Sequence, residues 1–214
     1  KINRGTCWGI LLNQSNNCII SDSDIQNGGV CHCIEINNSY NMTIKNNNLY
    51  SNTNRNYHPS RGNAIESFLN DATEGRPYSN IIEGNNIHNT GGGIVIWGDS
   101  LTQVNNNIIR EICGTGLSVN TEKDGGDTTN NVGILIRGNI IANCGFINNT
   151  KTGMLIEAGN EDIQITNNLI DSIWTNDPGQ GGGTGIQNEA KGVIIKGNTI
   201  SHCYVNGISN VGSH

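Results

Sequence analysis

Charged, aromatic and proline residues are all scarce in this chain of 214 residues. Only 14% of the residues are charged, 5% are aromatic and three are proline. No stretch of ten residues carries apolar side chains at spacings of three and four, so the pattern does not favour helices. No apolar run approaches the length of a transmembrane segment. The net charge of −6 is opposite to the basic stripe that nucleic acid requires as a partner.

Glycine and asparagine are abundant instead, with 29 and 38 copies. Many of the asparagines belong to a repeated phrase, in which an apolar residue and two spacers precede Asn, one further residue, and Ile or Leu. Repetition with a fixed internal order is typical of a solenoid. The copies run from Ile44 to Leu49, Ile82 to Ile87, Val104 to Ile109, Ile136 to Ile141, Ile165 to Ile170 and Ile195 to Ile200, with a degenerate copy from Ile20 to Ile25.

A second phrase lies between the copies of the first and consists of a small residue followed by alternating apolar residues. Its eight copies begin at Gly9, Cys33, Ala64, Gly93, Gly116, Gly153, Gly185 and Gly207. Alternation with a period of two predicts strands, and the shortest repeat accommodates three short strands with tight turns. We therefore predict an all-β fold, a right-handed parallel β-helix (solenoid) of about eight coils with inserted loops.

The asparagine of the first phrase has a structural explanation. It tolerates left-handed backbone angles at a turn, and stacked copies can bond through their side-chain amides. We predict an internal ladder along the helix axis. Its members are Asn47, Asn85, Asn107, Asn139, Asn168 and Asn198, and Ser23 occupies the equivalent position of the degenerate copy.

Both phrases resemble the parallel β-helix repeats of the pectate-lyase-like superfamily, over nearly the whole chain. The resemblance implies an extracellular or cell-surface protein, since most members bind, cleave or epimerise polysaccharides and others are tailspikes, adhesins or surface proteins. The asparagine-rich texture is also similar to that of archaeal disaggregatases. The catalytic motifs of polygalacturonases, classical pectate lyases and mannuronan epimerases are missing, so the resemblance transfers no catalytic residue.

We expect one domain over residues 1–214, as the core fragment of a longer chain. Lys1 leads directly into a coil and His214 follows directly on one, with no covering helix or loop at either end. Open solenoid ends also favour self-association, end to end or side by side.

The seven cysteines are assigned mainly to packing. Cys113, Cys144 and Cys203 each follow the first phrase closely and predict an inward column of thiols, which Cys31 could join. The run Cys31-His32-Cys33 lacks the spacing of zinc sites, so no metal site is assigned. Binding of Ca²⁺ stays an open alternative at the acidic insertions 120–131 and 174–184, although their sequences lack regular Ca²⁺-binding signatures.

Two acidic residues break the second phrase at its outward third position. Glu35 and Glu66 occupy this position in consecutive coils, with backbones about 4.8 Å apart. Like charges at that distance are solvated, bridged by a cation, or coupled so that one pKa rises. Paired carboxyl groups also carry out glycoside hydrolysis.

Aromatic residues lie near these acids in the next outward column. We predict that Phe68 and Trp97 offer a stacking face for a sugar ring, or else cover the helix under a loop. Glu157 and Glu189 repeat the arrangement of adjacent acids farther along.

An inserted loop supplies further candidates. Arg55, Tyr57, His58 and Arg61 lie within residues 51–62. An arginine can hold a uronate carboxylate, and a histidine or tyrosine can move a proton.

The leading hypothesis is an extracellular polysaccharide-degrading enzyme, either a hydrolase or a lyase, acting on a neutral or acidic glycan. Glu35, Glu66, His58 and Arg61 are its catalytic candidates. The substrate-binding candidates are Trp97, Phe68, Arg55, Tyr57, Glu157 and Glu189. A non-catalytic glycan-binding or adhesin module and a structural, filament-forming surface protein are the alternatives.

Overall fold

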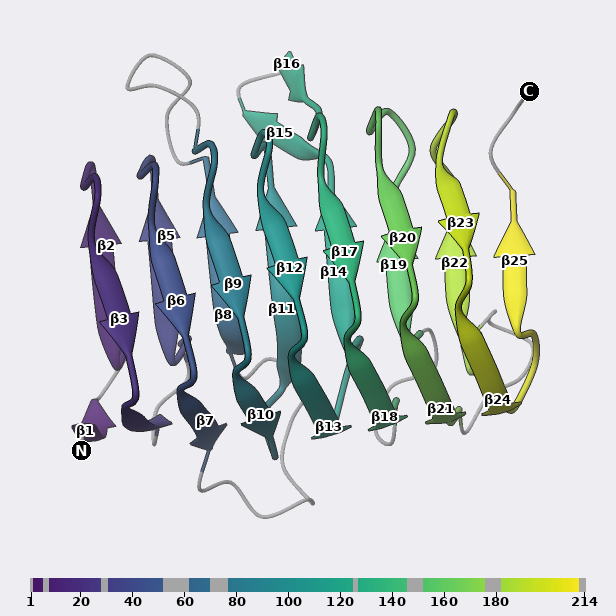
Figure 1. Cartoon of the computed structure of the whole chain (residues 1–214), viewed down its shortest axis with the longest axis horizontal. Coiled ribbons are helices and arrows are strands. Elements are labelled where there is room, and N and C mark those ends of the chain that lie inside the picture. The colour runs from purple at the N-terminus through teal and green to yellow at the C-terminus, as the bar shows by residue number, and fades with distance from the viewer. Residues whose placement is uncertain are drawn as a thin grey trace.

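The structure is a computed structural model that describes residues 2–5, 8–27, 31–51, 62–69, 77–124, 127–145, 152–175 and 182–211. Its strands form three parallel sheets along one axis, and each coil contributes one strand to each sheet in turn (Figure 1). The sheets contain eight, eight and seven strands within the described residues. The predicted all-β parallel β-helix is therefore confirmed.

The strands of each sheet are named in spatial order. Sheet 1 contains β1 (Ile2–Gly5), β4 (Asp24–Asn27), β7 (Asn48–Ser51), β10 (Asn86–His88), β13 (Ile108–Ile112), β18 (Ile140–Cys144), β21 (Leu169–Ile173) and β24 (Thr199–Cys203). Sheet 2 contains β2 (Ile10–Asn13), β5 (Ile34–Asn37), β8 (Asn63–Phe68), β11 (Gly92–Trp97), β14 (Leu117–Asn120), β19 (Met154–Ile156), β22 (Ile186–Asn188) and β25 (Ile208–Asn210). Sheet 3 contains β3 (Ile19–Ser21), β6 (Thr43–Lys45), β9 (Ile81–Glu83), β12 (Gln103–Asn105), β17 (Leu135–Arg137), β20 (Gln164–Thr166) and β23 (Ile194–Lys196). A separate antiparallel hairpin, β15 (Glu122–Asp124) with β16 (Asp127–Thr129), follows β14.

The core is a set of aliphatic columns enclosed by the three sheets. Ile34, Ile65, Ile94 and Leu117 follow one another in register in sheet 2, and all are fully buried. Burying each such side chain stabilises the fold by about 2 kcal/mol. The alternation of the second phrase thus fixes which face of each strand is inside.

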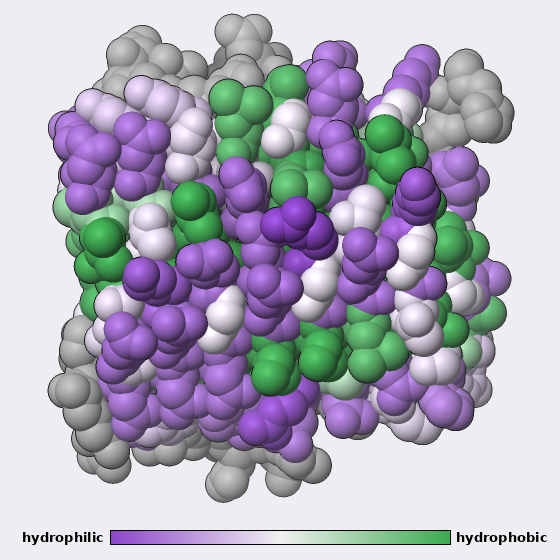
Figure 2. Space-filling model, in the orientation of Figure 1, coloured by the Kyte–Doolittle hydropathy of each residue, from purple (hydrophilic) through white to green (hydrophobic). Residues whose placement is uncertain are grey.

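The outer surface over sheets 1 and 3 is mostly hydrophilic, with separate hydrophobic patches (Figure 2). One exposed apolar column, Ile108, Ile140 and Leu169, lies in register across three strands of sheet 1. No helix within the described residues has the length and hydropathy to cross a membrane.

The predicted asparagine ladder is present at the corner between sheets 3 and 1. Asn85 donates from its backbone N–H and its Nδ2 to Oδ1 of Asn107, at 3.0 and 2.9 Å. Asn107 repeats both bonds to Asn139, and its Nδ2 also donates to the carbonyl of Ile82 at 2.9 Å. The same pattern continues to Asn198. At the other end, Ser23 donates only its backbone N–H to Asn47.

A second ladder, which the sequence analysis missed, occupies the corner between sheets 2 and 3. Asp99 donates its N–H to Oδ1 of Asn131, and Asn131 donates both its N–H and Nδ2 to Asn160. Asp99 is fully buried, and its carboxylate accepts from the hydroxyl of Ser67 at 2.7 Å. Mixed residue types at this corner hid the repeat.

The cysteine column is only partly as predicted. Cys144 and Cys203 lie in one inward column of sheet 1, in register with Ile173 of the strand between them. Cys113 is displaced from this column by one residue, and a shift of one residue reverses the direction of a side chain on a strand. Cys31 does not join the column, because it forms a disulfide, and Cys33 faces the core.

Removing one rung tests the first ladder. Asn107→Ala deprives both donors of Asn85 of their acceptor and removes one of the two donors to Asn139, all in a buried setting. We expect a loss of about 3 kcal/mol or more in the free energy of unfolding, measured by urea denaturation. The exposed Asn13→Ala is the control and should change it by less than about 0.5 kcal/mol. Equal effects from the two variants would contradict the ladder's role.

Asp99 predicts a pH dependence of stability. Burial raises the pKa of Asp99 from 3.8 to about 6. Between these values the folded state holds more protons than the unfolded state. Asp99 therefore favours folding most below pH 4, and about 3 kcal/mol is lost as the pH rises through 6. Asp99→Asn should remove this component, so that the difference in unfolding free energy between variant and wild type changes across pH 4–7. A difference that is constant with pH would contradict the assignment.

Candidate functional site

The register of sheet 2 brings the two predicted acids side by side. Glu35 of β5 pairs directly with Glu66 of β8, as the repeat predicted. The whole outward column is in register, in the order Leu11, Glu35, Glu66, Val95, Ser118, Leu155, Gln187 and Ser209.

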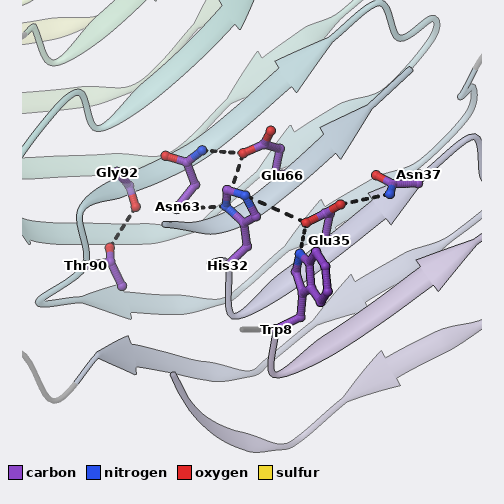
Figure 3. Close-up of polar contacts among 8 residues, drawn as sticks. All are labelled: Trp8, His32, Glu35, Asn37, Asn63, Glu66, Thr90 and Gly92. Atoms are coloured by element: carbon purple, nitrogen blue, oxygen red, sulfur yellow. Dashed lines mark hydrogen bonds and ion pairs between the residues drawn. The ribbon is translucent and has the colours of Figure 1, made fainter. Parts of the chain in front are cut away.

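The two carboxylates are not simply solvated. The side chain of Glu35 is 11% exposed and that of Glu66 is 15% exposed. Glu35 accepts a hydrogen bond from the indole N–H of Trp8, and its Oε1 accepts another from Asn37 Nδ2 at 2.8 Å (Figure 3). Two donors on separate oxygens are the environment of a carboxylate, which can only accept.

His32 lies between the two acids (Figure 3). Its Nδ1 is 3.1 Å from Oε2 of Glu66, and its Nε2 is 3.7 Å from Oε2 of Glu35. The backbone N–H of Asn63 donates to Nδ1 at 2.9 Å, and Nδ2 of Asn63 donates to Oε2 of Glu66. One imidazole and one asparagine thus connect the carboxylates of two coils.

The contacts of His32 Nδ1 favour one tautomer of the ring. Because Nδ1 accepts from the backbone N–H of Asn63, the hydrogen of the neutral ring is on Nε2, which faces Glu35. Nδ1 also lies 3.1 Å from Oε2 of Glu66, which accepts from Nδ2 of Asn63. Because Nδ1 has one lone pair, a hydrogen bond from Glu66 would compete with the bond from Asn63.

The electrostatic environment of Glu66 favours its protonated form. Burial raises the pKa of Glu66 above its usual value of 4.5. The nearby His32 and the hydrogen bond from Asn63 oppose this rise, and the charge of Glu35 adds to it. The net direction is upward, as for a carboxyl group that holds its proton.

The fold and the site can now be compared with known proteins. The sequence pattern of the family described as "Right handed beta helix region" matches residues 8–214. This chain belongs to that right-handed β-helix family. No curated protein sequence matches it.

Solved structures similar to this β-helix protein share its fold at low sequence identity. An alginate lyase from Paenibacillus sp. str. FPU-7 has a TM-score of 0.51 and 11% identity, over 85% of this chain and 75% of that one. A tailspike protein mutant of E. coli bacteriophage HK620, in complex with a pentasaccharide, has a TM-score of 0.52 and 13% identity, over 95% and 42%. The Agl-KA catalytic domain has a TM-score of 0.51 and 14% identity, over 96% and 44%. The β-helix protein therefore spans less than half of the last two.

The two residues of the predicted aromatic platform contact each other. Phe68 and Trp97 lie in register on β8 and β11 and contact each other edge to face, with ring centroids 6.5 Å apart. Trp97 is only partly exposed, and its Nε1 is buried without a hydrogen-bond partner among the described residues. The exposed aromatic residue beside the acids is Trp8, at 40%.

The other predicted residues are not brought to the pair in the described part of the β-helix protein. Glu157 accepts from the backbone of Thr121, and Glu189 accepts from Gln187, on coils well beyond β8. Arg55, Tyr57, His58 and Arg61 lie outside the described residues. Within the described residues no group of three or more His, Cys, Asp or Glu side chains is arranged to hold a metal ion.

Trp8, His32 and Asn63 are functional candidates that the sequence analysis missed. Each stands immediately before the small residue that opens a copy of the second phrase, so the signal was present in the repeat. It was overlooked because these positions lie at the start of each strand, three residues before the outward third position that holds Leu11, Glu35 or Glu66.

The coupling between the acids can be measured without any substrate. Glu35→Gln removes a negative charge that raises the pKa of Glu66, so that pKa should fall. ¹³C NMR titration of the glutamate carboxyl carbons measures it. Glu83→Gln, on sheet 3, is the control and should leave the titration of Glu66 in place. A Glu66 titration that is the same in both variants would show that the two acids are not coupled.

Proposed function

We propose that this protein is an extracellular glycan-degrading enzyme, and specifically a glycoside hydrolase. The observation that carries the proposal is the direct pairing of Glu66 with Glu35 around His32, in a setting where burial raises the pKa of Glu66 and two donors bond Glu35. Glycoside hydrolysis requires this combination of one protonated and one ionised carboxyl group.

The chemistry assigns a role to each acid. Glu66 transfers its proton to the glycosidic oxygen as the bond from that oxygen to the anomeric carbon breaks. Glu35 either attacks the anomeric carbon or takes a proton from the water that attacks it. Trp8, which bonds Glu35 through its N–H, presents its exposed ring as a stacking surface for a neighbouring sugar.

The charge of the outer face of sheet 2 supports a neutral glycan. This face carries Glu35, Glu66, Glu157 and Glu189. The Lys and Arg side chains that the structure describes lie elsewhere: Lys45, Arg137 and Lys196 on sheet 3, Arg110 on sheet 1, and Lys191 at a corner. A uronate chain laid along the axis would meet several carboxylates, whereas a neutral chain would not. The same charge disfavours a lyase, whose substrate carboxylate must be neutralised.

The comparisons support a carbohydrate substrate in general terms. Among proteins of similar fold, one is an alginate lyase and another was solved with a bound pentasaccharide. The disulfide at Cys31 supports an oxidising, extracellular location.

A screen of neutral and acidic polysaccharides tests the proposal. We expect new reducing ends from a neutral glycan, without the ultraviolet absorbance of unsaturated products. Glu66→Gln should lower kcat by about 10²-fold to 10⁴-fold, because the general acid is lost. Thermal unfolding of the variant verifies that it is folded, and Glu83→Gln is the matched control for lost charge.

Three results would contradict the proposal. Unsaturated products would indicate a lyase, and binding without product would indicate a glycan-binding module. A Glu66→Gln variant that retains the wild-type rate would remove the proposed acid.

A further inference from the structure

Asn63 holds the proposed acid, and its own position depends on the next coil. Asn63 of β8 is in register with Gly92 of β11 (Figure 3). A Cβ atom on Gly92 would lie 2.1 Å from Oδ1 of Asn63. Real Cβ atoms do not approach an oxygen so closely, so the amide of Asn63 occupies space that any other residue at position 92 would fill.

The backbone conformation does not require glycine at position 92. The φ angle of Gly92 lies outside the left-handed region, so any residue could adopt its conformation. Gly197 is a useful contrast. Its Cβ would also meet an asparagine oxygen, that of Asn167 at 2.4 Å, but its φ of +69° accounts for the glycine by itself.

We propose that Gly92 is a positioning residue for the proposed acid, because its missing side chain seats the amide of Asn63 against Glu66. Gly92 acts on Glu66 only through Asn63. The inference rests on the proposed function for its effect on catalysis, but the positioning itself does not require catalysis.

The geometry defines what Gly92→Ala changes. The added methyl displaces Oδ1 of Asn63 and rotates Nδ2 away from Glu66. The backbone bond from Asn63 to His32 is kept, since it does not involve the amide. Losing a donor to the carboxylate makes ionisation of Glu66 harder. The alkaline limb of the activity profile, where the acid loses its proton, should therefore move to higher pH.

A double-mutant cycle tests the proposal with Gly92→Ala, Asn63→Ala and the combined variant. We expect each single variant to lower kcat about tenfold or more, with little change in KM, because the acid is misplaced. The combined variant should be no worse than Asn63→Ala alone, since without the amide there is nothing for the methyl to displace. The combined variant also lacks the steric clash between the methyl group and the amide, so it can still be measured if Gly92→Ala folds poorly.

Two readouts separate positioning from a general loss of structure. The pH profile and the ¹³C titration of Glu66 should shift upward in Gly92→Ala and Asn63→Ala alike. Gly197→Ala, the control, should lose stability through its strained backbone but retain the wild-type titration of Glu66. The titration still tests the positioning if the glycan screen finds no activity.

Additive effects of the two single variants would overturn the proposal. An unchanged Glu66 titration in Gly92→Ala would do the same.

Discussion

The stacking of each coil on its neighbour in a single register is the constraint on which the rest of the structure depends. Buried amides enforce it, because an asparagine inside the ladder donates its backbone N–H and its side-chain amide to the next coil and accepts the same two bonds from the coil before. A shift in the register of one coil against its neighbour would leave several buried polar groups without hydrogen-bond partners. Each such group would cost about 1–3 kcal/mol of stability. The positions of residues on the outer faces of the sheets are therefore fixed by the buried contacts, without any contribution from the outward side chains.

That arrangement creates the electrostatic problem at the candidate site. His32 and Asn63 are 31 positions apart but adjacent in space, and so are the two acids that follow them. Two largely buried carboxylates one strand apart are unfavourable when both are charged. Donors to Glu35 stabilise its charge, whereas burial favours the protonated form of Glu66. The rigid scaffold thus makes the two acids unequal, which is what acid catalysis needs.

The sequence predicts much of the fold and of the acid pair because the repeat defines equivalent positions in successive coils. Period-two alternation and the spaced asparagines were sufficient for the sheets, the first ladder and the pairing of Glu35 with Glu66. The second ladder escaped notice because its positions hold Asp99 as well as asparagine, and Pro77 on the coil before has no N–H to donate. Cys113 was assigned to the wrong column because an error of one residue in the alignment of the repeats changes the direction of a side chain. The partial burial of Trp97 could not be predicted from its column, since an outward-pointing side chain on a strand is not always exposed.

In a solenoid, the environment of a residue is set mainly by the same position in the coils before and after it. Asp99 shows this for stability: a carboxylate in a ladder of amides is buried as firmly as its neighbours, and its pKa rises as a result. Gly92 shows it for the candidate site, where a missing side chain on one coil leaves space for an amide from another. A residue that departs from the repeat therefore affects the adjacent coils as much as its own coil. For this reason His32, Glu35 and Gly92 affect Glu66 although they are distant from it in sequence.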